Sequence, residues 1–185
     1  MRRKGTTLLE LMIVITIIGI LSGMMLSRLD YSVFRLDAGV RELQAQLQLA
    51  QRMALRRQRD VMVSIDATNN RVRIVQDDND NSAIDAGERV SSHTLEDGVR
   101  FAAPPAGLFG GSNASSVIGS SLKTVTAFPT VIFRRDGAAS SDLFLYITTT
   151  GVHGATNYRA VHVVKATGRA DWYRYVSSAW TQGDL

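Results

Sequence analysis

Glu10 is a charged residue in an apolar setting. It is the only charged side chain between Gly5 and Ser27, and most of its neighbours are aliphatic. A carboxylate at the centre of a membrane helix costs roughly 2.5–3.5 kcal/mol on insertion scales, so packing alone explains it poorly. We therefore expect Glu10 to pair with a positive group.

A second set of oxygen-bearing side chains has the spacing of a calcium loop. In the segment 77–88, such side chains occupy positions 1, 3, 5, 9 and 12 of an EF-hand-type loop, and Ser82 replaces the usual glycine at position 6. The candidate ligands are Asp77, Asn79, Asn81, Asp85 and Glu88. Calcium affinity of roughly 0.1–1 mM would be typical of extracellular modules. The alternative is a solvated hairpin turn, in which Asp and Asn are common.

A third set combines cations with aromatic residues, which could bind phosphates and stack on nucleic-acid bases. The cations are Arg134, Arg135, Lys165, Arg169 and Arg174, and the aromatic residues are Trp172, Tyr173 and Tyr175. The net charge of the chain is +4, but Arg2, Arg3 and Lys4 supply three of these charges. A DNA-binding surface would therefore require local clustering of the later cations.

Other catalytic or metal-binding patterns are absent from the sequence. His93, His153 and His162 lie far apart without metal-ligand spacing, and the chain has no cysteine. There is no Gly-x-Ser-x-Gly, no phosphate-binding glycine loop and no His-Glu-x-x-His. We therefore do not expect an enzyme, although a membrane-anchored periplasmic enzyme remains an alternative.

The segment that carries Glu10 is long enough to cross a membrane. At about 1.5 Å per residue, residues 6–28 match a hydrocarbon core of about 30 Å. The cations before it predict a cytoplasmic N-terminus, with all residues after the span on the other side of the membrane. A cleaved secretory signal is the alternative, but an Ala-x-Ala-like cleavage site is missing between Leu21 and Leu29.

The remaining elements are predicted from hydrophobic periodicity. Apolar residues at helical spacing, and no proline before Pro104, predict a helix over residues 6–59. A period of two follows, and it predicts a hairpin over 61–75 and strands over 130–133, 143–148, 159–164 and 171–176. Residues 102–121 read as a long surface loop. The fold class is therefore α+β, with one long helix packed on an antiparallel sheet.

The stretch from Lys4 to Val14 resembles the prepilin signature of type IV pilins and type II secretion pseudopilins. Its parts are a short basic leader, a glycine at the cleavage site, a glutamate five residues later and an unbroken apolar run. The resemblance implies that a prepilin peptidase cuts after Gly5 and that the new N-terminus, Thr6, is methylated. Thr6 departs from the usual phenylalanine. Glu10 would then offset the positive terminus of a neighbouring subunit.

Residues 43–59 also resemble the helix of GspH/FimT-type minor pseudopilins and minor pilins, and the resemblance predicts the domain organisation. It predicts a leader at 1–5, a transmembrane and filament-core helix at 6–28, its amphipathic continuation at 29–60 and a periplasmic β-rich head at 61–185. The implied location is the bacterial inner membrane, with a single pass, and then a filament.

The implied function is that of a structural subunit, near the tip of a type II secretion pseudopilus, whose partners are other pilin-like subunits. The alternative is a FimT-like minor pilin that primes a type IV pilus or binds DNA. Some FimT-like pilins bind DNA during uptake through a C-terminal Gly-Arg-x-Arg motif, but here Asp171 replaces the second arginine. An anion at that position would oppose phosphate binding.

Overall fold

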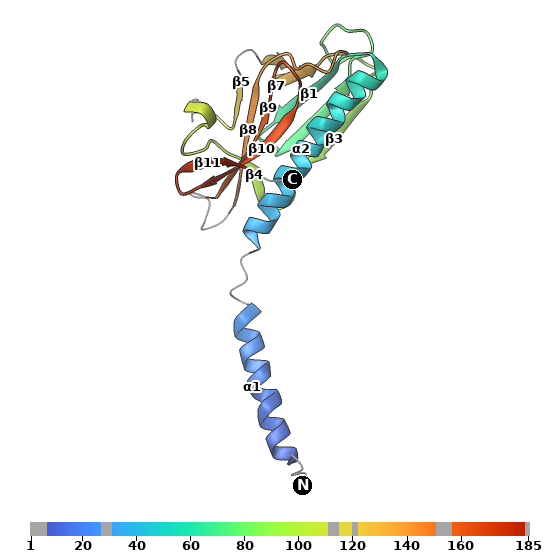
Figure 1. Cartoon of the computed structure of the whole chain (residues 1–185). Helices are drawn as coiled ribbons and strands as arrows, with labels where there is room; N and C mark the ends of the chain where they lie inside the picture. The colour runs from blue at the N-terminus through green and yellow to red at the C-terminus, as the bar shows by residue number, and fades with distance from the viewer. Residues whose placement is uncertain (1–6, 27–30, 111–114, 120–121, 151–156, 184–185) are drawn as a thin grey trace, which may run out of the picture. The chain divides into compact units, whose positions relative to one another are not determined.

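A computed structural model describes residues 7–26, 31–110, 115–119, 122–150 and 157–183 of the chain (Figure 1). The chain divides into two compact units, Met1–Tyr31 and Ser32–Leu185. The first unit contains helix α1, Leu8–Leu26, and the second contains helix α2, Ser32–Arg57, together with all the strands. The predicted helix over 6–59 thus corresponds to two helices, and its part at residues 27–30 lies outside the described residues.

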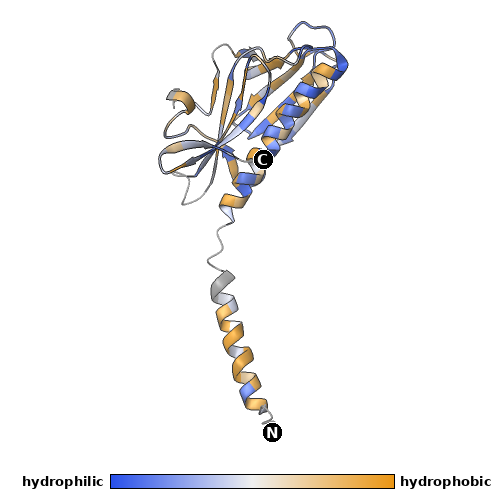
Figure 2. Cartoon of the chain, in the orientation of Figure 1, coloured by the Kyte–Doolittle hydropathy of each residue, from blue (hydrophilic) through white to orange (hydrophobic). Residues whose placement is uncertain are grey.

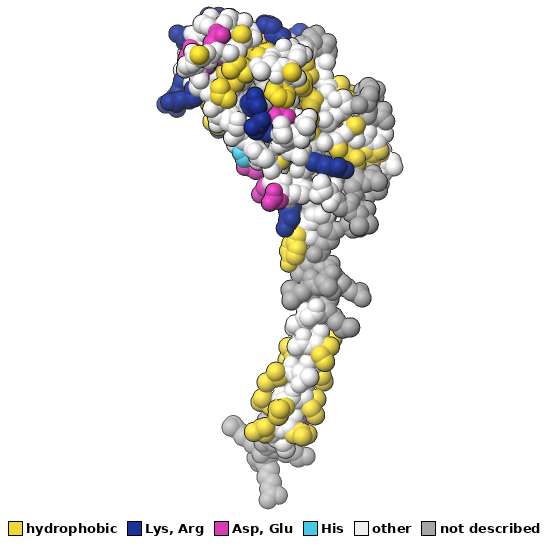
Figure 3. All heavy atoms as spheres, turned by 180° about the vertical axis from the view of Figure 1, so that it is seen from behind, with side chains coloured by type: hydrophobic (Ala, Val, Ile, Leu, Met, Phe, Trp, Pro, Cys, Tyr) yellow, Lys and Arg dark blue, Asp and Glu magenta, His cyan; other side chains and the backbone are white. Residues whose placement is uncertain are grey.

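Helix α1 forms in an apolar sequence without proline. The hydroxyl of Thr7 accepts a hydrogen bond from the Glu10 amide at 3.3 Å and so caps the first turn. Figure 2 shows that most residues of the helix are hydrophobic, and Figure 3 shows apolar side chains along it. The large apolar side chains from Leu8 to Leu21 are exposed. A helix of this kind needs lipid or other protein around it.

Length and hydropathy together decide whether a helix can cross a membrane. Among the residues that the structure describes, no helix combines the length and the hydropathy that crossing a membrane requires.

Helix α2 is amphipathic and presents one apolar face to the strands. Figure 2 shows its hydrophobic and hydrophilic residues alternating along the helix. Its buried residues recur at spacings of three and four, as the sequence predicts, and they are Leu36, Gly39, Val40, Leu43, Gln44, Leu47, Ala50 and Ala54. Gln44 is the one long polar side chain among them, and its Nε2 donates to the Ala170 carbonyl at 2.8 Å.

The first sheet has five antiparallel strands in the order β3-β2-β1-β7-β6. The predicted hairpin is formed by β1, Val61–Asp66, and β2, Arg71–Gln76, with Val61 opposite Gln76. The other strands are β3, Val90–Thr94, β6, Lys123–Val125, and β7, Phe128–Phe133. Strand β1 is buried on both faces because α2 covers one of them and residues including Ile84 pack on the other.

The second sheet has six antiparallel strands, with the order β11-β10-β9-β8-β4 and β5 paired to β8. Its strands are β4, Val99–Phe101, β5, Val117–Gly119, β8, Leu143–Thr149, β9, Tyr158–Val163, β10, Ala170–Val176, and β11, Ala179–Gln182. The predicted loop at 102–121 contains β5 and the short 3-10 helix η1, Leu108–Gly110. That prediction was wrong in part, because Leu108 is buried and its amide donates to the Tyr146 hydroxyl at 3.0 Å.

One core joins α2 to both sheets. It includes Leu43 and Leu47 of the helix, Val63 of the first sheet, and Leu145 and Val161 of the second. The predicted fold class, α+β with a helix packed on antiparallel strands, is confirmed.

Candidate functional site

Glu10 lies in the first turn of α1, and its side chain is exposed within its unit. In the described part of the chain, Glu10 has no ion-pair partner. The predicted cleavage and methylation residues, Gly5 and Thr6, lie outside the described residues. The pairing of Glu10 with a positive group therefore stays a prediction.

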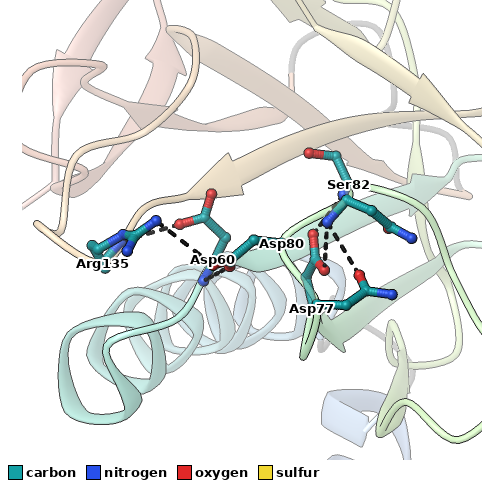
Figure 4. Close-up of polar contacts among 7 residues, drawn as sticks. Asp60, Asp77, Asp80, Ser82 and Arg135 are labelled. Carbon is teal, nitrogen blue, oxygen red and sulfur yellow. Dashed lines mark hydrogen bonds and ion pairs between the residues drawn. The ribbon is translucent and has the colours of Figure 1, made fainter.

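The loop 77–88 is organised by its own side chains (Figure 4). The buried carboxylate of Asp77 accepts hydrogen bonds from the amides of Asn81, at 3.1 Å, and Ser82, at 2.7 Å. The Nδ2 atoms of Asn79 and Asn81 both donate to one oxygen of Asp85, at 2.8 and 2.6 Å. These two bonds lower the pKa of Asp85.

The fifth candidate ligand closes the same loop. The two carboxylate oxygens of Glu88 accept from the amides of Asp78, at 3.3 Å, and Asp85, at 3.0 Å. The loop is also held to the end of β7, because Arg135 pairs with Asp80 at 3.6 Å (Figure 4). Within the described ranges, no three His, Cys, Asp or Glu side chains form a group that could hold a metal ion.

The predicted basic residues lie on several elements. Gln51 of α2 donates to the carbonyls of Gly137, at 2.9 Å, and Thr167, at 2.6 Å, and so joins two turns. These turns carry Arg134, Arg135, Lys165 and Arg169. Arg174 lies roughly 17 Å further along β10, at about 3.3 Å per residue.

Ion pairs and strand geometry separate the basic residues further. Arg169 pairs with Asp171 at 2.7 Å, and Trp172 is only 6% exposed. Because side chains alternate along β10, Tyr173 and Tyr175 face away from Arg174. In the view of Figure 3, cationic side chains lie among acidic and apolar ones. The cations and aromatic residues thus do not form one stacking surface.

The two described histidines, His93 and His162, contact neighbouring side chains within the fold. His93 of β3 lies 3.0 Å from Glu42 of α2. His162 stacks on Phe144, with 4.4 Å between ring centres, and burial lowers its pKa although Asp142 opposes the shift. The third histidine, His153, lies outside the described residues.

Sequence reasoning missed a buried arginine. The side chain of Arg159 in β9 is 2% exposed, and its Nε donates to Asp37 of α2 at 2.6 Å. Burial lowers the pKa of Arg159, and Asp37 opposes this shift. The pattern of Tyr158–Val163 predicts a strand, but nothing in the local sequence indicates that Arg159 is buried. Its partner, Asp37, lies 122 residues away in the sequence.

Comparisons with known proteins cover both units. A family model described as type II transport protein GspH matches residues 39–168, and a prokaryotic N-terminal methylation motif matches residues 1–26. A search of curated proteins found no match.

Two solved structures are similar to the chain in outline. The minor pseudopilin EpsH of the Vibrio cholerae type 2 secretion system is 14% identical, with a TM-score of 0.48, over 74% of this chain and 94% of that one. The type IV minor pilin FimU of Pseudomonas aeruginosa is 12% identical, with a TM-score of 0.44, over 80% of this chain and 88% of that one.

Proposed function

The chain belongs to the GspH family of type II transport proteins, and from this we propose that it is a minor pilin-like structural subunit of a type II secretion pseudopilus. The observation that carries the proposal is the joint presence of the GspH match over residues 39–168 and the methylation motif over residues 1–26. In this role the chain joins the filament near its tip, supports protein secretion and acts through assembly, without catalysis.

Processing would precede assembly. A prepilin peptidase would cut after Gly5, and Thr6 would become the methylated N-terminus, within the segment that the methylation motif covers. Residues 6–28, a longer stretch than α1 itself, would cross the bacterial inner membrane once, with the head in the periplasm. The exposed apolar surface of α1 supports this proposal, because lipid and neighbouring helices can both cover it.

Calcium binding by the loop 77–88 is a second proposal. It is supported by the ligand spacing and by the meeting of Asn79, Asn81 and Asp85, whose side chains already contact one another. DNA binding has no comparable support, because Arg169 is paired with Asp171 and Arg174 lies on the opposite strand face from Tyr173.

Deletion of the gene, with complementation by the full chain, tests the main proposal. Secretion of type II substrates should stop in the deletion strain and recover on complementation, and mass spectrometry should find Thr6 as the N-terminus. Normal secretion with loss of pilus-dependent motility would instead favour the minor pilin of a type IV pilus. A mature chain that still begins with Met1 would contradict the proposed processing.

A further inference from the structure

An open pocket of about 390 Å³ lies where the first turn of α2 passes the end of the second sheet. Val33 contributes from the helix, Arg159 and Asn157 from β9 and the residue before it, and Arg174 and Val176 from β10. The pocket therefore has basic groups and apolar side chains in its wall. The proposed function does not use this pocket, and the DNA-binding alternative involved only its Arg174.

The pocket has an excess of positive charge. Arg159 and Arg174 are direct partners in the antiparallel register of β9 and β10, an arrangement in which like charges repel. Asp37 neutralises Arg159 at 2.6 Å. Arg174 is exposed and has no ion-pair partner among the described residues. Asp37 thus pairs with Arg159 alone, and the positive charge of Arg174 is left over.

Hydrogen-bond donors at the pocket are also incompletely used. The Oδ1 of Asn157 accepts from Arg159 at 3.1 Å, but its Nδ2 is buried and has no acceptor among the described residues. Buried donors without partners are uncommon in folded proteins and call for an explanation. The adjacent N-terminal end of α2, a helix of 26 residues, adds a favourable potential for an anion.

We propose that this pocket binds one carboxylate, and that its occupant is an Asp or Glu side chain of a neighbouring subunit. The identity of this occupant rests on the proposed function. A carboxylate matches the single excess positive charge and can take hydrogen bonds from a guanidinium and an amide. Val33 and Val176 can pack against the methylene groups of such a side chain. A phosphate carries more charge, and the other predicted cations are on distant turns.

Nuclear magnetic resonance of the full chain in detergent micelles tests the pocket itself. The probe is the α-amide of N-acetylglutamate, compared with the neutral glutamine analogue and with inorganic phosphate. Saturable shifts of the Arg159 Nε and Asn157 Nδ2 signals are expected with the glutamate probe alone. Arg174→Gln should weaken this binding at least fivefold, whereas Arg100→Gln, a change at an exposed arginine of β4, should leave it unchanged.

Three results of this titration would overturn the carboxylate site: no saturable shift, equal shifts with the glutamine analogue, or tighter binding of phosphate. Circular dichroism should show that both arginine variants remain folded.

Photo-crosslinking in cells tests the occupant. A benzoylphenylalanine replaces Val176, which is 45% exposed at the pocket, and in the control it replaces Val90, which is 46% exposed on the edge strand β3. The Val176 position should give a crosslink to another filament subunit, within a few residues of an Asp or Glu in its sequence by mass spectrometry. Arg174→Gln should reduce this product.

Crosslinks that map to segments without an acidic residue would reject the proposed contact, as would the absence of subunit crosslinks in filaments that contain the chain. If the chain is missing from filaments altogether, the proposed function fails and the neighbouring-subunit occupant fails with it. The titration in micelles still decides whether the pocket binds a carboxylate, so the two failures are distinguishable.

Discussion

At the scale of single residues, Asp66 shows how neighbouring groups set the pKa of a buried carboxyl group. Asp66 at the end of β1 is buried, and burial opposes its ionisation. Hydrogen bonds from Asn69 and Arg71 outweigh this effect and lower its pKa to about 2. The Arg71 contact is 2.8 Å long and stabilises the turn of the first hairpin. Asp66 therefore acts as a structural anion.

The lowered pKa of Asp66 predicts a pH dependence of stability. Its folded value, about 2, lies below the unfolded value near 3.8, so its contribution is complete above about pH 4 and is lost as the pH falls through 2. In urea unfolding, the difference in midpoint between the wild type and Asp66→Asn should be largest at pH 6 and shrink toward pH 2. A difference that is independent of pH would contradict this role.

Glu10 is the residue on which assembly is expected to depend. Glu10→Gln removes the charge that would pair with the terminus of a neighbour, and breaking a buried pair in this way costs about 3–5 kcal/mol. The amount of the chain in purified filaments should therefore fall steeply, while cleavage after Gly5 continues. Glu42→Gln, which removes a carboxylate from α2, should assemble normally. Equal incorporation of both variants would count against the pairing.

At the scale of the elements, the turn at Gly168 depends on particular residues, as the strands do. Gly168 has a φ of +64°, and a Cβ added there would collide with the Gly137 carbonyl. The adjoining Gln51 side chain holds both turns, with hydrogen bonds of 2.9 and 2.6 Å. Packing alone thus explains why a glycine stands at position 168, and DNA binding is not needed to explain it.

Gly168→Ala should destabilise the head by about 2 kcal/mol, because it adds both backbone strain and a steric collision. Thermal unfolding followed by circular dichroism measures this change. Thr167→Ala, at the exposed neighbouring position, is the matched control and should stay within about 0.5 kcal/mol of the wild type. Similar melting temperatures for the two variants would show that the turn can relax.

The loop 77–88 is the element in which calcium binding is proposed. Calorimetric titration of the full chain in detergent should give a saturable heat with a dissociation constant of roughly 0.1–1 mM. Asp77→Asn should abolish this heat, because it weakens the ligand at position 1 of the loop. Asp136→Asn, in the turn after β7, serves as the control. An absence of heat at several millimolar calcium would reject the site.

At the scale of the whole molecule, the two units differ in how their apolar side chains are covered. The main core lies entirely within Ser32–Leu185, where α2 packs on both sheets. The large apolar side chains of α1 from Leu8 to Leu21 have no such core and are exposed. This division agrees with the proposed role, in which one part is covered by lipid or neighbouring helices and the other is folded by itself.

A protein limited to residues 32–185 should therefore be soluble without detergent and unfold in one cooperative transition. A sedimentation experiment and a urea titration with two spectroscopic probes measure this. The full chain should require detergent under the same conditions. Non-coincident transitions of the short protein would show that its core depends on the first unit.

The sequence by itself determined the local elements and the processing signature. Alternation in β1 and β2, with polar residues between them, was sufficient to predict the hairpin and its position. The spacing of Leu36, Leu43 and Leu47 predicted the buried face of α2. Strands such as β3 and β11 were missed because they are short and largely exposed at sheet edges, where burial leaves no alternating pattern.

Only the tertiary structure decided which charged groups meet. Arg159 becomes a buried ion-pair partner because α2 places Asp37 against β9 at 2.6 Å. Arg174 faces it only through the register of β9 and β10. Periodicity along a chain reports which side of an element is apolar, whereas the pairing of distant charges depends on packing and register between elements. The prepilin-like segment could be identified from sequence, and the carboxylate pocket could not.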